Sequence, residues 1–235
     1  MKQIVHRSLF LSFVCFLVSI STSAQPALQA PQASQKAWVG QTVGLTEILV
    51  KYHRPAVRGR EVWGQLVPMN VVWRAGANEN TVIRFSTDVT IEGQRLAAGL
   101  YGLHMIPTKE KWTVIFSNNS NSWGSFGYNQ DEDALRVEVT PEKINRFHEF
   151  LTFEFDDIAP ASAVCALKWA SLSVPFRIET DVHQVVLASM RNELRNIEQF
   201  NWQAWLEAAN YSLQNDINHE EALGWASRSV FMSPN

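Results

Sequence analysis

The chain has 235 residues, 46% of them hydrophobic, enough to bury the core of one large domain, or of a medium domain with an appendage. Its 20 lysines and arginines stand against 23 aspartates and glutamates, which gives a formal net charge of −3 at pH 7. This balance provides no basic field for nucleic acid or anionic lipid, so we exclude both as partners.

Residues 1–24 have the order of a cleavable signal peptide. Lys2 and Arg7 come first, an apolar run follows from Ser8 to Ile20, and small polar residues lead to Ala24. This order predicts cleavage after Ala24 and export to the periplasm or the extracellular medium. Losing Lys2 and Arg7 would reduce the 20 basic residues to 18 against 23 acidic ones, and the net charge from −3 to −5. We expect no membrane span in the mature chain, because no segment reaches the roughly 20 apolar residues that a spanning helix needs.

Residues 25–35 are rich in proline, glutamine and alanine and lack any periodicity, which predicts a flexible leader before the first strand. We expect order to begin near Lys36. Cleavage would leave Cys165 as the one remaining cysteine, so no disulfide can form within the chain. Cys165 lies in an apolar, strand-like run and is predicted to be a buried, inert thiol.

Residues 36–180 alternate between apolar and polar side chains with a period of two, which is typical of strands with one wet and one dry face. Turn-forming residues interrupt the alternation at Glu92-Gly93-Gln94 and at Ala98-Gly99, where we expect hairpins. With no helical pattern between the runs, the segment predicts an antiparallel β-sandwich, jelly-roll-like in outline. The alternating runs are residues 48–52, 83–85, 112–116, 135–139, 151–155 and 174–178.

Residues 181–235 change to helical spacing and predict a tail of three short helices. Residues 201–235 are similar to one tetratricopeptide-type helical hairpin, which occurs once. A single hairpin cannot bury its own apolar face, so we expect it either to pack on the β domain or to begin a longer array. The end at Ser233-Pro234-Asn235 leaves truncation of such an array open.

The segments around residues 52–60 and 73–80, together with Trp123, gather the side chains best suited to binding. Glycine and proline mark these segments as loops, where binding groups usually lie. Arginine suits carboxylate or phosphate and tryptophan suits sugars or cations, so we predict non-catalytic binding of an anionic or sugar-like ligand. Alternatively, arginine and glutamate on adjacent loops pair with one another and only pin the loops to the sheet. The candidates are Arg54, Arg58, Arg60, Trp73, Arg74, Asn78, Glu79 and Trp123.

Several motifs carry a resemblance to a known family. They are Tyr52-His53-Arg54-Pro55 with Arg58-Gly59-Arg60, the segment from Trp73 to Glu79, the run from Ala98 to Pro107, the run from Trp112 to Phe116, and Trp123-Gly124. From about Lys36 to Thr180 the chain resembles the family called domain of unknown function 2911. The resemblance implies an exported bacterial β domain, sometimes followed by tetratricopeptide-like helices, with no assigned catalytic residues.

Two further hypotheses remain open. In the first, His53, Glu79 and His104 converge on a divalent metal and the protein is a metal-dependent enzyme. Their spacing matches no recognised ligand motif, and His104 lies in an alternating strand where a satisfied core histidine is the alternative. In the second, the helical tail is a surface for a protein partner. Without the metal, we expect no cofactor.

Overall fold

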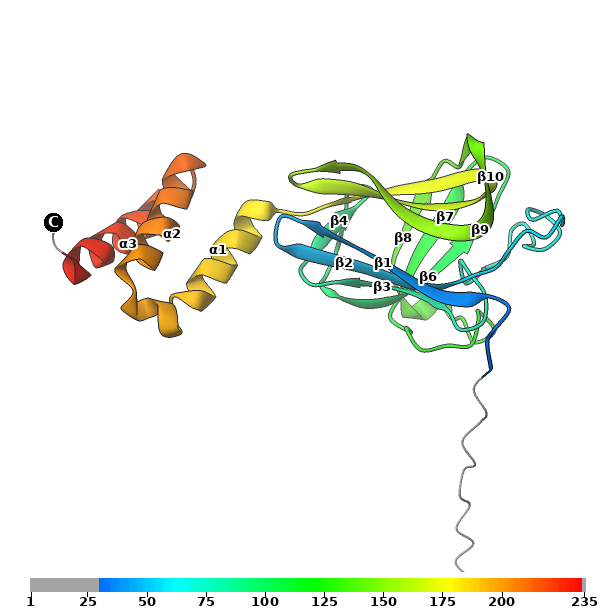
Figure 1. The fold of residues 1–235 in the computed structure, drawn as a ribbon, viewed down its shortest axis with the longest axis horizontal. Coiled ribbons are helices and arrows are strands. Elements are labelled where there is room, and N and C mark those ends of the chain that lie inside the picture. Colours follow the sequence, from blue (N-terminus) through cyan, green and yellow to red (C-terminus); the bar gives the residue numbers. More distant parts are fainter. Residues whose placement is uncertain (1–29, 234–235) are drawn as a thin grey trace, which may run out of the picture. The chain divides into compact units, whose positions relative to one another are not determined.

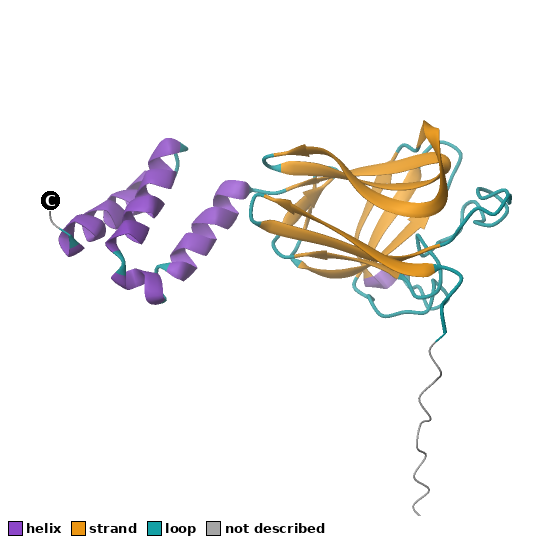
Figure 2. Ribbon diagram, in the orientation of Figure 1, coloured by secondary structure: helices purple, strands orange, loops and turns teal. Residues whose placement is uncertain are grey.

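The computed structural model describes residues 30–233 and consists of two antiparallel sheets followed by three helices (Figures 1 and 2). This architecture confirms the predicted mainly β sandwich with a C-terminal helical appendage. The predicted signal peptide, residues 1–24, lies outside the described residues, as does most of the predicted leader. Among residues 30–233, no helix is long and apolar enough to cross a membrane.

The first sheet has six strands, in the order β1-β2-β3-β6-β7-β8, each antiparallel to its neighbours. Four of the predicted alternating runs, residues 48–52, 83–85, 112–116 and 135–139, each lie in a strand of this sheet. The strands are β1 (Gln35–Val43), β2 (Thr46–Arg54), β3 (Thr81–Phe85), β6 (Gly99–Ile106), β7 (Trp112–Ser117) and β8 (Asp133–Val139).

The second sheet has four strands, β5 (Gln94–Leu96), β4 (Val89–Ile91), β10 (Ser162–Glu179) and β9 (Glu142–Ala159), in that order. Strands β9 and β10 form a long hairpin (Figure 1). The tight turn between β4 and β5 places Glu92 at φ 48° and Gly93 at φ 79°. Two consecutive left-handed residues suit the two-residue hairpin turn, which matches the hairpin predicted there.

The core lies between the sheets and is built by the inward side of each alternating strand. In β2 the inward residues Ile48, Val50 and Tyr52 are buried. Burying each large apolar side chain contributes roughly 1.5–3 kcal/mol, and this dry interface holds the sandwich together. Cys165 is fully buried in the same core, and burial raises the pKa of its thiol, as expected of an inert cysteine.

Strand β2 continues into a segment that crosses to the second sheet. Ala56 forms an isolated antiparallel bridge with Phe150 of β9, and the Val57 N–H donates to the Glu149 carbonyl at 2.8 Å. The loop prediction from Tyr52 onward needs a correction, because β1 pairs with β2 as far as Arg54.

A loop of residues 118–129, here called the covering loop, is tied to the outer face of the first sheet. The Asn80 side chain accepts from the Ser122 N–H at 3.1 Å and donates to the Asn119 carbonyl at 3.4 Å. Gly102 lies directly beneath, where a Cβ atom would collide with the Asn119 carbonyl oxygen. The close approach of loop and sheet therefore depends on a glycine at this position.

The helices are α1 (Val182–Glu193), α2 (Trp202–Gln214) and α3 (His219–Met232), with short 3₁₀ turns at Gln130–Glu132 and Ile197–Phe200. Asp181 begins α1 by accepting from the Gln184 N–H at 3.0 Å. The helices share a small apolar cluster built from Leu187, Leu194, Ala208, Ala209 and Trp225. Three helices agree with the helical spacing of the sequence.

Candidate functional site

A cavity of about 460 Å³ lies among the segment that follows β2, strand β10 and the covering loop. Its lining combines apolar and aromatic side chains with two arginines, Arg60 and Arg74. Of the predicted ligand-binding residues, the structure brings together three in this cavity, namely Arg60, Trp73 and Arg74.

Backbone pairing fixes the segment that carries Trp73 and Arg74. Trp73 and Met105 of β6 exchange two backbone hydrogen bonds, both of 2.8 Å, so a single isolated antiparallel bridge holds this segment beside the end of β6. The chain then turns sharply at Ala75, which has a φ of 50° although it is not glycine, and Thr81 Oγ1 donates to its carbonyl at 3.0 Å. Left-handed backbone at a buried non-glycine residue is strained and is retained only where the surroundings enforce it.

Four tryptophans pack together beside the cavity. Trp63 meets the rings of Trp73, Trp112 and Trp169 edge to face, with centroids 5.8, 4.9 and 5.6 Å away. Trp73 and Trp169 line the cavity and stack on each other with centroids 6.1 Å apart and planes 16° apart. The indole N–H of Trp73 donates to the Gly76 carbonyl at 3.2 Å, whereas those of Trp63 and Trp169 are buried and have no acceptor within residues 30–233.

Arg74 is a partly buried cation without a protein partner. No acceptor and no carboxylate of the described residues binds its guanidinium, and its Nε is fully buried. Burial lowers the pKa of Arg74 from its ordinary value. The guanidinium fits against the covering loop because Gly124 has no side chain there, since a Cβ would lie 3.2 Å from Arg74 Nη1.

Arg54 differs from Arg74, because the protein itself occupies its donors. Its Nε donates to the Leu151 carbonyl at 3.0 Å and its Nη2 to Thr152 Oγ1 at 2.6 Å. The guanidinium carbon also lies 5.9 Å from the centre of the Phe150 ring. Arg54 therefore joins β2 to β9 instead of facing an open space.

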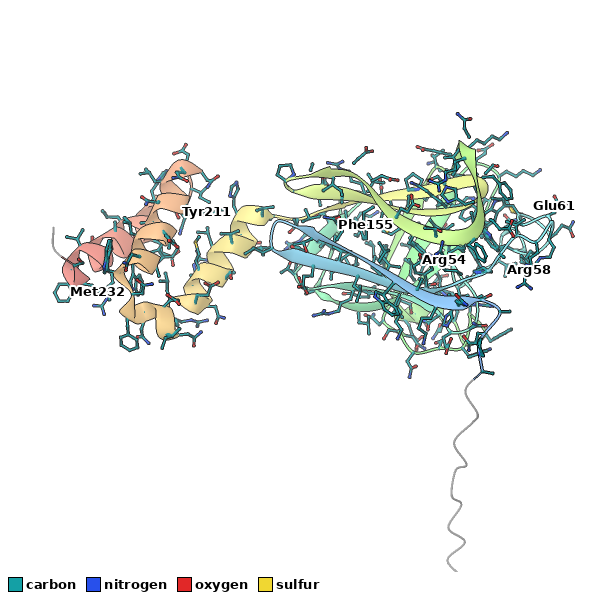
Figure 3. The ribbon with its side chains drawn as sticks, in the orientation of Figure 1. Arg54, Arg58, Glu61, Phe155, Tyr211 and Met232 are labelled. Atoms are coloured by element: carbon teal, nitrogen blue, oxygen red, sulfur yellow. The ribbon has the colours of Figure 1, made fainter. Side chains whose placement is uncertain are left out.

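The other two candidate arginines, Arg60 and Arg58, differ in whether they line the cavity. Arg60 lines the cavity, but two of its nitrogens donate to the carbonyls of Val57 and Ala56 at 3.0 and 2.7 Å. Arg58 is exposed in the segment that follows β2, where Figure 3 shows it near Glu61 and away from Arg54. Arg58 has no contact with the cavity.

Asn78 and Trp123 lie outside the cavity as well. The Asn78 amide donates to Gln32 Oε1 at 3.0 Å and to the Ser34 carbonyl at 3.2 Å, which ties the segment before β1 to the turn. Trp123 is 61% exposed, and its backbone forms an isolated bridge with Glu79.

His53 and Glu79 line a second cavity of about 400 Å³ on the outer side of the first sheet. His53 Nε2 and Glu79 Oε2 lie 3.3 Å apart, without the alignment of a hydrogen bond. Burial lowers the pKa of His53, while Glu79 raises it and the nearby charges of Lys36 and Lys51 lower it further. Two lysines around this pair repel a dication.

His104 does not line the second cavity. Its Nδ1 bonds Ser125 Oγ at 2.8 Å, and its ring packs on Tyr128 with centroids 5.4 Å apart. Burial lowers the pKa of His104 to about 4. Within residues 30–233, no group of three metal-ligating side chains is placed to hold an ion.

Ser125 lines the first cavity, so its contact with His104 brings a hydroxyl and an imidazole together there. A serine nucleophile needs a base that can take up the proton and a third group that orients the base. An imidazole with a pKa of about 4 is a weak base, and among the described residues His104 forms no ion pair with a carboxylate. This pair therefore suits the anchoring of the loop better than catalysis.

Sequence reasoning missed Trp169 and Phe126, which both line the first cavity. Trp169 ends an apolar run that predicts a core strand. The neighbouring residues in the sequence do not indicate that its ring reaches a cavity beside Trp73. Phe126 could have been found from the sequence, because an aromatic residue between Gly124 and Gly127 lies in a loop and is a candidate for binding. Its side chain is 86% exposed.

The cavity has the chemistry of an acceptor-binding site. Two residues of its lining, Arg74 and Trp169, each have a buried donor without a partner among the described residues, Nε and Nε1; because both atoms are closed to solvent, an occupant would be received by the terminal nitrogens of Arg74. The lining contains no aspartate or glutamate. Such an arrangement can receive a carboxylate, a phosphate or another anion.

Comparison with known proteins gives one family. No curated protein and no solved structure matches the chain. The family described as "Protein of unknown function (DUF2911)" matches residues 34–178, which span both sheets and both cavities. The match covers more than half of the sequence and agrees with the resemblance carried by the motifs, so the chain belongs to the DUF2911 family.

Proposed function

We propose that the β domain binds a small anion in the cavity beside Trp73 and Trp169, with Arg74 as the principal contact. One observation carries the proposal: Arg74 is a partly buried guanidinium at a cavity, with no carboxylate, carbonyl or hydroxyl of the described residues bound to it. Buried polar groups in folded proteins are normally paired, and an unpaired charge costs more than an unpaired neutral group. An anion from outside would supply the missing partner.

The composition of the cavity supports binding without catalysis. Its lining holds no Asp, Glu, His, Cys, Lys or Tyr among the described residues, so no general acid or base faces the bound anion. The metal-dependent alternative has weaker support, because His53 and Glu79 stand among positive charges and His104 lies apart from them. A non-catalytic binding domain is therefore the function that we propose.

We also propose that the protein works outside the cytoplasm, in the periplasm or the medium. The support is the order of charged, apolar and small residues in residues 1–24. Mass spectrometry of the protein isolated from its host should find Gln25 as the first residue. Retention of Met1 in the cell-associated protein would contradict export.

A second role for the helices, as a surface for a protein partner, has one observation in its favour. Large apolar side chains of the helical part stay exposed, among them Phe200, Leu213, Leu223 and Phe231 at 75%, 68%, 70% and 77%. The comparison with a tetratricopeptide-type hairpin remains a prediction. Deleting residues 181–235 should leave the β domain folded if the helices serve a partner, whereas loss of folding would show a structural role.

The anion proposal is tested by titrating the purified protein with acetate and with inorganic phosphate at constant ionic strength. Binding is followed by calorimetry and by tryptophan fluorescence, which the Trp73–Trp169 stack should make sensitive to an occupant. Arg74→Gln should weaken binding at least tenfold, because a hydrogen bond to a charged group contributes about 1.5–3 kcal/mol. The matched control is Arg84→Gln, which removes the same charge from a side chain that is 54% exposed and outside the cavity.

Saturable binding that depends on Arg74 and not on Arg84 would support the proposal. Equal weakening in both variants would mean that the anion responds only to net charge, and would refute the site. Absence of binding by both acetate and phosphate would refute the proposal that Arg74 marks an anion site.

A further inference from the structure

We infer that the anion bound at Arg74 carries an apolar body, so that the ligand is an amphipathic organic anion with a carboxylate or phosphate head. This inference rests on the proposed function and adds the ligand class. It comes from the side chains that surround the arginine, which sequence reasoning did not bring together.

Most of the side chains that line the cavity are apolar, although polar atoms contribute a comparable share of its surface. Pro55, Val67 and Pro68 line it together with Trp73 and Trp169. Hydroxyl groups come from Ser34 and Ser125, and the latter is already bonded to His104. A sugar would need many more polar partners, since each buried hydroxyl without a hydrogen bond costs binding energy.

Exposed apolar side chains gather at this cavity. Leu66, Val71 and Phe126 all line it, yet they are 38%, 53% and 86% exposed. The three come from two separate parts of the chain, residues 66–71 and the covering loop. Such a gathering on a protein surface marks a place where apolar material is buried on binding.

The size of the cavity also fits a small organic molecule. Its volume of about 460 Å³ falls within the range of roughly 300–1,000 Å³ that ligand sites occupy. Inorganic phosphate or acetate would leave much of this apolar wall in contact with water. A longer ligand would place its charge at Arg74 and its body against the tryptophans and Phe126.

The test uses a series of straight-chain carboxylates with the purified protein: acetate, butyrate, hexanoate and octanoate. Affinity should rise roughly fourfold for each methylene that the cavity buries. The neutral comparison ligand is 1-hexanol, which should bind at least tenfold more weakly than hexanoate. Calorimetry supplies the stoichiometry, which should be one ligand per chain.

Two variants separate the head from the body of the ligand. Arg74→Gln should weaken every carboxylate by about the same factor. Phe126→Ser should lower the gain in affinity per methylene, and because Phe126 is 86% exposed, removing its ring leaves no hole in the core that would unfold the protein. Phe147→Ser is the matched control, since Phe147 is 55% exposed and lies outside the cavity.

The outcomes distinguish the inference of an apolar ligand body from the proposal of an anion site at Arg74. If acetate and phosphate bind through Arg74 and chain length adds nothing, the apolar body is refuted while the anion site stands. If a neutral sugar such as glucose binds more tightly than hexanoate, the ligand class is wrong. If no anion binds, the proposed function fails and this inference fails with it.

Discussion

Replacing Arg74 by methionine should make the ligand-free protein more stable, although it destroys the proposed anion site. The guanidinium is partly desolvated and has no acceptor within the described residues, and burial already lowers its pKa. Methionine has a similar length, is flexible and has no donor to satisfy. Removing an unpaired charge from such a position relieves a cost that the folded state otherwise carries.

The magnitude follows from how far Arg74 is buried. An unsatisfied buried donor costs about 1–3 kcal/mol, and a charged donor costs more. Arg74 is only partly buried, so part of that cost is screened by solvent, and we expect Arg74→Met to raise the free energy of unfolding by about 1 kcal/mol. Arg54→Met is the contrasting variant, because it breaks the bonds to Leu151 and Thr152. It should lower the free energy of unfolding by about 2–3 kcal/mol.

The assay is urea unfolding followed by far-ultraviolet circular dichroism, with the slope of free energy against urea compared among the variants. Opposite shifts of the midpoint for Arg74→Met and Arg54→Met would agree with our reasoning. If Arg74→Met loses as much stability as Arg54→Met, the guanidinium of Arg74 has a structural partner, and its role as the contact for an anion is refuted.

Two further predictions concern the covering loop and the sheet beneath it. The pKa of His104 falls from 6.5 to about 4 on folding, so its contribution to stability is complete above pH 6.5 and is lost as the pH drops toward 4. The loss in the free energy of unfolding should reach about 3 kcal/mol. His104→Gln should flatten this part of the plot of unfolding free energy against pH. His219→Gln, at an exposed histidine, should leave the plot unchanged. Identical slopes in the wild type and His104→Gln would contradict the burial of the neutral imidazole. Gly102→Ala should cost about 1–3 kcal/mol in urea unfolding because the new Cβ meets the Asn119 carbonyl, while Gly127→Ala, with open space around it, should be neutral. Equal stability of these two variants would mean that the loop does not rest on the sheet as described.

The fold was largely predictable because strand alternation is a local property of the sequence. Ile48, Val50 and Tyr52 show the inward face of β2 without any knowledge of their partners. The β4–β5 turn was predictable from Gly93, which has the left-handed backbone that glycine favours, although Glu92 beside it is also left-handed and its residue type does not favour that backbone.

The site was predictable only in part, since partners distant in the sequence decide what each arginine does. Arg54 and Arg74 look alike in the sequence, but Leu151 lies 97 residues from Arg54 and occupies it, whereas nothing in the described chain occupies Arg74. Trp169 reaches the cavity from the second sheet, and its contact with Trp73 has no local signature. The residue types therefore indicated that the site binds anions. Contacts between residues distant in the sequence decide which arginine is free to bind one.

The covering loop has a thermodynamic consequence for the two cavities. Ser120 and Asn121 form part of the wall of the cavity that holds His53, and Ser125 and Phe126 form part of the wall of the one that holds Arg74. Any occupant that displaces the loop at one end changes the free energy of the other end, and such coupling is reciprocal. If an anion at Arg74 displaced the loop, it would alter the proton affinity of His53, and protonation of His53 would alter the affinity for the anion by the same factor.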